Sequence, residues 1–345
     1  MGITIYQAVS VLTQKPTLSS VARAAGVSVP TVSQVMRGTG RISQETRTKV
    51  LEAAKRLRYI PNSRAAAMRS GENREIGFVI NQLSNPFNSE VISGVVDLLE
   101  AEGYLLSVLD TRDDAARQGR QLEAFIRNGR GGLLWVPTLE TPSETVELLK
   151  AHGMPTVTFL RPISTDFDHV GIRNTDATLT ATSYLSELGH RRIAYFGGTE
   201  MTSVRRDRIE GYLQSMEALG LEQTVVWPSV DRKEAALESF VSLMEKYPDT
   251  TAIVCNGDMV ALGACLACNR LGYIPGREVS VIGFDDVEEA SVAIPPLTTM
   301  SVSPVLLGRK LGRVLLDRMH ERAMPTAVSE IPARLVVRET TGAPV

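Results

Sequence analysis

Residues 17–36 constrain the fold of this 345-residue chain more than any other segment. Apolar residues recur there at helical spacing in two short runs, which are Val21, Ala22 and Ala25, then Val32, Val35 and Met36. Gly26 supplies a left-handed position that ends the first helix, and Ser28 can cap the second, where Pro30 is tolerated in the first turn. Because the turn is short, the two helices must cross steeply. The segment therefore predicts a helix-turn-helix, whose second helix enters the DNA major groove.

The charge distribution sets the same region apart. The chain has 37 basic and 39 acidic residues and a net charge of −2. Residues 15–71 hold eleven basic and two acidic side chains, a net charge of +9, while residues 1–14 hold none, so the remainder carries −11. A basic head on an acidic body favours a polyanion as the partner of the head alone, with a merely solvated basic face as the alternative.

Further motifs occupy residues 41–43, 59–62, 189–194, 207–212, 259–263 and 294–299. Together with residues 17–36, they resemble the LacI/GalR family of bacterial transcription regulators. Within that family, residues 26–33, 40–43 and 331–335 look most like the maltose-regulon repressor subgroup. The resemblance implies an α-helical helix-turn-helix headpiece and a two-lobed, periplasmic-binding-protein-like α/β body with parallel sheets.

Alternating patterns in the body independently predict parallel sheets covered on both faces. We expect strands over residues 76–81, 104–110, 132–137, 155–160, 192–197, 252–256 and 279–283. We expect helices over residues 87–102, 112–128, 142–152, 175–188, 204–219, 233–246 and 258–271. A break near residues 161–168 separates two lobes.

The predicted organisation has four parts. They are an N-terminal extension (1–14), a headpiece (15–61), a hinge (62–73) and an effector-binding and dimerisation body (74–345). Lobe 1 is expected at about 74–162 and 301–326, and lobe 2 at about 163–300 and 327–340, with the ligand site in the cleft between them.

The resemblance places Val29, Pro30 and Gln34 where family members read base edges. Val29 and Pro30 offer apolar surface for a thymine methyl, and Gln34 can pair bidentately with adenine. Val29 could instead pack in the headpiece core. Many family members carry Arg in place of Gln34 and Asn in place of Arg37, so we expect an unusual operator. The hydroxyl side chains suited to phosphate contacts are Thr17, Ser28, Thr31, Ser33, Ser43 and Thr46, although Ser43 could serve only as a helix cap.

In the family, the hinge folds on DNA and two hinges lie in the minor groove. Asn62 is a good N-cap, and Ala65 matches the small residue of the hinge–hinge contact. Met68 stands where a family leucine wedges into the central base step. The alternative is a flexible linker without a DNA role.

The resemblance assigns Asn85, Phe87, Arg208 and Asp285 to the effector cleft. The Arg208 guanidinium can fork onto a carboxylate or a pair of hydroxyls, while Phe87 either stacks on a ligand ring or belongs to the core. Two polar residues usual in the family, an Asp and an Asn, are replaced by Leu160 and Gly257. The resemblance implies a small-molecule effector, a sugar or sugar derivative. Hydroxyl-rich sugars need such carboxylate and amide partners, so the two replacements argue for the alternatives, an unusual ligand or none.

Other functional classes have little support. Cys265 and Cys268 form a C-x-x-C pair, but a predicted helix contains them without a second ligand pair, so we expect buried packing rather than zinc or redox chemistry. Glycine-rich nucleotide motifs, a nucleophile elbow and a metal constellation are lacking, which predicts no enzyme, cofactor or metal. The basic head argues against a solute-binding protein without a DNA role.

Two further expectations concern location and assembly. The chain has no apolar run long enough to span a bilayer and no export signal, which predicts a cytoplasmic protein. Paired hinges require two-fold symmetry, and a leucine heptad tail is absent, so we expect a homodimer that binds double-stranded operator DNA.

Overall fold

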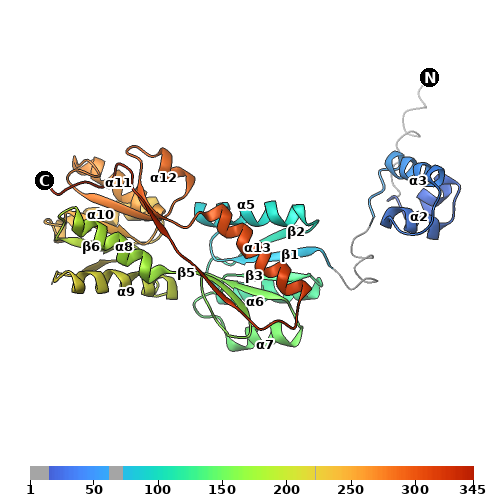
Figure 1. The fold of residues 1–345 in the computed structure, drawn as a ribbon, viewed down its shortest axis with the longest axis horizontal. Helices are drawn as coiled ribbons and strands as arrows, with labels where there is room; N and C mark the ends of the chain where they lie inside the picture. The colour runs from blue at the N-terminus through green and yellow to red at the C-terminus, as the bar shows by residue number, and fades with distance from the viewer. Residues whose placement is uncertain (1–14, 62–72, 222) are drawn as a thin grey trace, which may run out of the picture. The chain divides into compact units, whose positions relative to one another are not determined.

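The computed structural model describes residues 15–61, 73–221 and 223–345. The chain divides between Asn73 and Arg74 into two compact units, which we call the headpiece and the body (Figure 1). The expected extension over residues 1–14 and the hinge residues Asn62, Ala65 and Met68 lie outside the described residues.

The described part of the headpiece, residues 15–61, contains three helices packed on a small core. They are α1 (Leu18–Ala25), α2 (Val29–Arg37) and α3 (Gln44–Arg56). The buried core residues are Val21, Ala22, Val32, Val35, Val50, Ala53 and Ala54. Gly26 has a φ of 68° and ends α1, as predicted. The apolar faces foreseen in the sequence thus meet across the turn, and α3 closes the core from the third side.

The first lobe of the body is built on a six-stranded parallel sheet. Its strand order is β11 (Val328–Ile331), β5 (Asp168–Ile172), β4 (Thr156–Phe159), β3 (Gly132–Trp135), β1 (Glu75–Ile80) and β2 (Leu105–Asp110). In the centre of the sheet, Phe78 of β1 pairs with Val108 on one side and Leu134 on the other.

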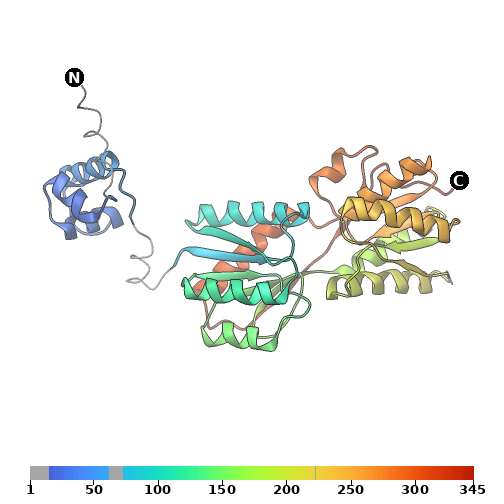
Figure 2. The same ribbon diagram turned by 180° about the vertical axis from the view of Figure 1, so that it is seen from behind.

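Helices cover both faces of this sheet (Figures 1 and 2). They are α5 (Pro86–Ala101), α6 (Ala115–Arg127), α7 (Ser143–Ala151) and α13 (Pro304–His320). Phe78 and Leu134 pack with α5 and α13, whereas the adjacent Val79 and Leu133 pack with α6 and α7. Successive side chains of a strand alternate between faces, so apolar residues on both faces require helices on both faces.

The second lobe repeats this plan. Its sheet order is β12 (Arg334–Val336), β10 (Thr298–Ser301), β9 (Ser280–Asp285), β8 (Ala252–Cys255), β6 (Ile193–Phe196) and β7 (Val225–Trp227). Only the β10–β12 pair of this sheet is antiparallel. Its helices are α8 (Asn174–Glu187), α9 (Ser203–Ala218), α10 (Lys233–Lys246), α11 (Asp258–Leu271) and α12 (Glu288–Val292), with α8 packed on α9 and α10 on α11.

The lobe boundaries expected near residues 162 and 326 are wrong, because β5 and β11 both belong to the first sheet. The chain crosses between lobes at residue 173, at 302–303 and at 332–333 instead. Strand β5 begins with Asp168 and His169, which do not suggest a buried strand. They are buried because Arg318 pairs with Asp168 at 2.6 Å and Thr158 Oγ1 lies 2.9 Å from His169 Nδ1.

The helix expected over residues 112–128 starts later. Arg112 and Asp113 have φ values of 55° and 57°, which a helix cannot contain. Asp114 then caps α6, because its Oδ1 accepts a hydrogen bond of 2.7 Å from Arg117 N.

The cysteines lie where packing was expected. Cys255, Cys265 and Cys268 are free thiols and all three are buried. Within residues 15–61, 73–221 and 223–345, no cluster of His, Cys, Asp and Glu could hold a metal ion. No helix of the described chain combines the length and apolarity needed to cross a membrane.

Candidate functional site

The helix N-termini of the headpiece are capped by the predicted hydroxyls. Thr17 Oγ1 accepts a hydrogen bond from Ser20 N at 3.1 Å, and Ser20 Oγ accepts one from Thr17 N at 2.9 Å. Ser28 caps α2 and Ser43 caps α3, each accepting a hydrogen bond of 3.3 Å from the backbone three residues later. These caps hold the positive ends of three short helices in place.

The remaining predicted phosphate contacts lie beside these caps. Thr31 Oγ1 is 2.8 Å from Ser28 Oγ, and Thr46 Oγ1 accepts a hydrogen bond of 2.9 Å from Ser43 Oγ. Ser33 lies half-buried in the middle of α2. A capping hydroxyl keeps a free lone pair or proton, so capping and phosphate contact are compatible.

The start of α2 presents apolar side chains to solvent. Val29 is 39% exposed and is absent from the core cluster, so the alternative that it packs in the headpiece core is wrong. Pro30 is exposed beside it. An exposed apolar pair at a helix N-terminus has no packing role in the described headpiece, which leaves it available for contact with a partner.

Gln34 lies one turn further along α2 and is half-buried. Its side chain rests against the turn before α3, where a Cβ added to Gly40 would lie 2.8 Å from Gln34 Oε1. Gly40 also has a φ of 82°. The turn therefore supports the Gln34 side chain through a position that glycine alone fills easily.

Positive charge dominates the described headpiece. Residues 15–61 contain nine basic and two acidic side chains. Among them the structure forms one ion pair, Lys49 Nζ to Glu45 Oε1 at 2.7 Å, and this contact lowers the pKa of Glu45. The other cations of the described headpiece remain available to an anionic partner.

A cavity of about 110 Å³ lies between the two lobes of the body. All four predicted effector residues, Asn85, Phe87, Arg208 and Asp285, line it. The other lining residues are Asn81, Asn88, Leu160, Thr202, Val204, Arg205, Asp231, Asn256, Gly257 and Met259. The cavity lies at the carboxyl ends of parallel strands, where ligands bind to sheets of this kind.

Arg208 is fixed on all sides. Its Nε donates a hydrogen bond of 2.8 Å to Asn174 Oδ1, and its Nη1 donates to the backbone oxygen of Asn256. The guanidinium carbon lies 3.5 Å from the ring centroid of Phe284. Nη2 is 4.0 Å from Asp285 Oδ1. The guanidinium is thus a preorganised charge that needs no rearrangement to act on a ligand.

Asp285 ends β9 with a φ of 116°, in a region rarely occupied by residues other than glycine. It is 8% exposed. Burial raises the pKa of its carboxyl well above the usual range, although the charge of Arg208 opposes this shift. A strained backbone thus holds an acidic side chain at the cleft, where solvent reaches it poorly.

Sequence reasoning missed three polar residues of the second lobe. Arg205 is 6% exposed, and its Nε donates a hydrogen bond of 3.1 Å to the Gly197 carbonyl. Asn256 Nδ2 contacts both carboxylate oxygens of Asp231 at 3.1 Å. Burial raises the pKa of Asp231, and the Asn256 hydrogen bond opposes that shift. The signal for Arg205 was weak because it adjoins Arg206, whose side chain is 64% exposed.

The first lobe contributes amides and apolar groups. Asn85 Oδ1 accepts a hydrogen bond of 3.0 Å from Phe87 N and caps α5. Asn88 Nδ2 donates to Gln82 O at 2.7 Å and to Asn81 Oδ1 at 3.3 Å. Phe87 belongs to the core and stacks on Phe159, yet it also lines the cavity, so both of its expected roles are compatible.

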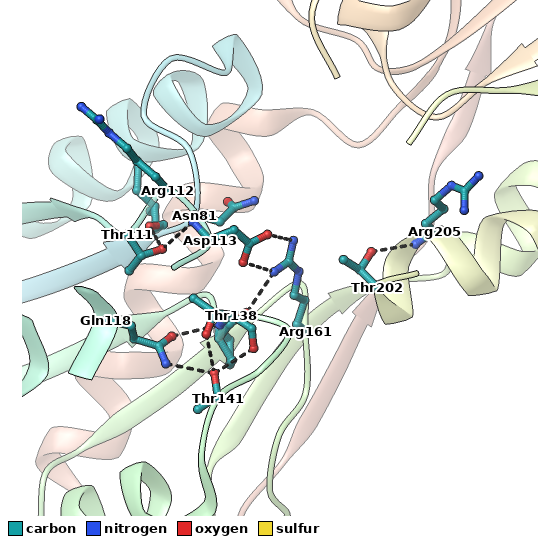
Figure 3. Close-up of polar contacts among 12 residues, drawn as sticks. Asn81, Thr111, Arg112, Asp113, Gln118, Thr138, Thr141, Arg161, Thr202 and Arg205 are labelled. Atoms are coloured by element: carbon teal, nitrogen blue, oxygen red, sulfur yellow. Dashed lines mark hydrogen bonds and ion pairs between the residues drawn. The ribbon is translucent and has the colours of Figure 1, made fainter. Parts of the chain in front are cut away.

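An ion pair ties the loops of the first lobe together beside the cavity. Figure 3 shows Arg161 and Asp113 on one side and Thr202 and Arg205 across from them. Arg161 contacts Asp113 with both Nη atoms, at 2.6 and 2.8 Å, and also donates to Pro137 O at 3.2 Å. The cavity lining from the first lobe consists of three asparagines, Phe87 and Leu160 and is therefore uncharged. The nearby charge of Arg161 is neutralised by Asp113.

Comparison with known proteins finds matches for both the headpiece and the body. Residues 17–62 match the model of bacterial regulatory proteins of the lacI family, and residues 182–341 match a periplasmic binding protein-like domain. The HTH-type transcriptional repressor PurR of Vibrio vulnificus is 30% identical over 94% of this chain and 98% of its own length. The maltose regulon regulatory protein MalI of Escherichia coli is 29% identical over the same shares.

Solved structures give the same result. The lac repressor dimer bound to operator and the anti-inducer ONPF has a TM-score of 0.85, at 26% identity over 96% of this chain and 100% of that one. A complex of the transcriptional regulator CelR with cellobiose has a TM-score of 0.71, at 27% identity over 94% of this chain and 100% of that one. PurR and MalI are similar to this chain at the same level, so identity does not select a subgroup. The chain belongs to the lacI family of bacterial regulatory proteins.

Proposed function

We propose that the protein represses transcription by binding a palindromic operator as a homodimer, and that a small molecule in the interlobe cleft modulates its affinity. The observation that carries this proposal is the exposed start of α2, with Val29 and Pro30 facing solvent on a basic helix-turn-helix unit. Val29, Pro30 and Gln34 contact base edges, and the capping hydroxyls with Ser33 contact phosphates.

Exposed apolar side chains of the body support a second copy as partner. Leu105 on the edge strand β2 is 62% exposed, Leu266 on α11 is 49% exposed, and Ile294 is 91% exposed. A single headpiece makes too few contacts for tight operator binding, so pairing through the body brings two headpieces to two half-sites.

The cleft supports control by a ligand because both lobes line it. A ligand that contacts both walls favours one lobe arrangement over the other and thereby shifts DNA affinity, typically by about 5–150-fold. The sugar-bound relative supports a sugar or sugar derivative as the ligand of this chain.

The hinge remains a prediction from the resemblance. We propose from the resemblance, since these residues lie outside the described ranges, that Asn62 serves as the N-cap of the hinge, Ala65 meets the second hinge and Met68 wedges into the central base step. Met68→Ala should keep non-specific, salt-dependent DNA binding and reduce operator bending. Equal bending by both proteins, with the same ranking of flexible and stiff central steps, would refute the wedge.

Selection of binding sites from random DNA tests the function, because it requires no knowledge of the operator. The purified full chain should enrich an inverted repeat with two half-sites, and sedimentation at micromolar concentration should show a dimer. Failure to enrich any sequence would contradict the proposed function. A stable tetramer, or a monomer that binds a single half-site, would contradict the proposed assembly.

A further inference from the structure

We propose that the cleft takes a hydroxylated anion, a carboxylate or a phosphate ester, and that Arg205 and the N-terminus of α9 bind the anionic group. The proposal rests on the proposed function, since it concerns the ligand of the same cleft. Its basis is the balance of hydrogen-bond donors and acceptors that the cavity leaves open.

Arg205 is the first open donor. The side chain is 6% exposed and lines the cavity, but only its Nε has a hydrogen-bond partner, the Gly197 carbonyl. Nothing in the described chain accepts a hydrogen bond from Nη1 or Nη2. A buried guanidinium with a free fork matches the planar oxygens of a carboxylate or a phosphate.

The local backbone is built to seat this arginine. Gly198 has a φ of 69°, and a Cβ added there would overlap Arg205 Cδ. Any side chain at residue 198 would collide with Arg205, so the loop between β6 and α9 requires glycine there to accommodate the arginine.

The start of α9 supplies further donors to the same cavity. Thr202 Oγ1 accepts a hydrogen bond of 3.2 Å from Arg205 N. The backbone N–H groups of Ser203 and Val204 have no acceptor among the described residues, and Thr202 and Val204 both line the cavity. No acidic residue lies in the first turn of this 16-residue helix. Its positive end thus faces the cavity with no acidic side chain from its own first turn.

The wall of the first lobe also offers donors. Asn85 Oδ1 is occupied by Phe87 N, and Asn81 Oδ1 is occupied by Asn88 Nδ2, which is itself oriented by Gln82 O. These contacts settle the orientation of each amide. The Nδ2 groups of Asn81 and Asn85 have no partner within the described residues, so both can donate to a ligand.

Acceptors are scarcer. Asp231 is engaged by Asn256, whose Oδ1 already accepts a hydrogen bond from Tyr195. Asp285 has no hydrogen-bond donor among the described residues, and its nearest cation, Arg208 Nη2, is 4.0 Å away. The cavity therefore offers several open donors, the open carboxyl of Asp285 and the lone pairs that Asn256 leaves free on Asp231. Every hydroxyl of a neutral polyol donates as well as accepts, so its hydroxyls would compete for these two carboxyls. An ionised carboxylate or phosphate group accepts without donating, and it can take up the free fork of Arg205 together with the N–H groups of α9.

Isothermal titration of the full chain can test this inference with matched six-carbon probes. D-gluconate and D-glucose 6-phosphate represent the two anion sources, and D-glucose and sorbitol are the neutral counterparts. We expect at least one anion to bind at least tenfold more tightly than either neutral probe. The anion that binds identifies the source as a carboxylate or a phosphate ester.

Variants of neighbouring arginines locate the anion site. Arg205→Gln should weaken the bound anion by about 10–100-fold, the usual weight of a charge-assisted contact. Arg206→Gln on the same helix should leave binding unchanged, because Arg206 does not line the cavity. If Arg205→Gln fails to unfold cooperatively, Arg205→Lys replaces it and should bind the anion more weakly than wild type, because it loses the planar fork.

Three outcomes would overturn the inference. They are equal or tighter binding of a neutral probe, undiminished anion binding in the Arg205 variant, and binding of no probe. Operator binding by the ligand-free wild type is measured alongside. It is also measured with each probe present, because the cleft ligand modulates operator affinity. Loss of sequence-specific binding under every condition would count against the proposed function, whereas retention under any of them would confine the failure to the ligand class.

Discussion

The headpiece surface and the interlobe cleft are built on opposite principles. The headpiece presents its candidate contacts on caps and helix turns that span residues 17–46, and most of these side chains are exposed or half-buried. The cleft draws its lining from residues 81 to 285. Of its four charged members, Arg205, Arg208 and Asp285 are less than 9% exposed and Asp231 is half-buried. Local geometry thus suffices for a surface that meets a large polyanion, whereas a site for a small ligand requires a folded domain around it.

The two regions also treat charge differently. In the headpiece, cations stay in solvent, where they attract phosphates over a distance at little desolvation cost. In the cleft, burial raises the pKa of Asp231 and Asp285 despite the nearby guanidinium of Arg208. We therefore expect the DNA affinity of the headpiece to depend on salt concentration. In the cleft, we expect the removal of one partner of a buried charge to be costly.

The largest test of this comparison is a methyl group added between α5 and α13. A Cβ at Gly94 would overlap the Val305 carbonyl oxygen, and the two helices would have to separate. Gly94→Ala should lower the free energy of unfolding of the body by about 3 kcal/mol or more. Denaturant titration followed by tryptophan fluorescence measures the body alone, since Trp135 and Trp227 both belong to it.

Gly119→Ala is the matched control for Gly94→Ala. Gly119 also lies inside a helix, α6, but a Cβ there meets nothing within 4 Å. Helix propensity alone should then stabilise the body, by up to about 1 kcal/mol. Similar destabilisation by both variants would mean that close helix contact does not govern the body's stability.

The contrast between local contacts in the headpiece and long-range contacts in the body explains which features the sequence could predict. The caps Ser28 and Ser43 and the end of α1 at Gly26 follow from residues three or four positions apart, and they were foreseen. Thr17 was foreseen only as a phosphate contact, and its role as the cap of α1 was missed. Strand β5 was missed because the partner that buries Asp168, Arg318, lies 150 residues away.

The cleft shows the same limit. The family resemblance supplied four lining residues, but Arg205 was hidden because its neighbour Arg206 has the same chemistry and is exposed. Burial, the hydrogen bond to the Gly197 carbonyl and the close approach of Gly198 distinguish Arg205 from Arg206, and these contacts exist only in the folded loop. A pair of adjacent glycines before an arginine-rich helix was the available signal.

Acidification should weaken the body through His169 and leave the headpiece untouched by this mechanism, because all four histidines lie in the body. Burial lowers the pKa of His169 to about 4, with a hydrogen bond to Thr158 opposing the shift. A depressed folded-state pKa means that the stabilisation is complete above about pH 6.5 and is lost as the pH falls toward 4.

The size of this effect is about 3 kcal/mol for a shift of this magnitude. Aspartates such as Asp258, whose pKa burial raises to about 7, act in the opposite direction. The measurement is therefore the difference in free energy of unfolding between wild type and His169→Gln at pH 7 and at pH 4. A difference that does not change with pH would show that His169 does not titrate in this range.

Base readout should respond to Gln34 and phosphate contact to Thr17. Gln34→Ala should lose about 1–3 kcal/mol on the selected operator and relax preference at one position of each half-site. Thr17→Ala removes a cap and a candidate phosphate contact, so it should weaken binding to all sequences nearly equally. Affinities for a set of single-base operator variants measure both. An unchanged preference profile in Gln34→Ala would contradict the assignment.

The smallest expected effect separates backbone strain from side-chain support in the headpiece. Gly38 and Gly40 have φ values of 70° and 82°, so alanine should cost each position about 1 kcal/mol of headpiece stability. Only Gly40 touches Gln34, since a Cβ at Gly38 meets nothing within 4 Å. Gly40→Ala should therefore displace the Gln34 amide and change base preference at the position that Gln34 reads. Gly38→Ala should reduce stability alone. If the two variants show the same operator preferences at temperatures where both headpieces are folded, the turn does not position Gln34. The helix caps would then be the local features that position side chains for DNA contact.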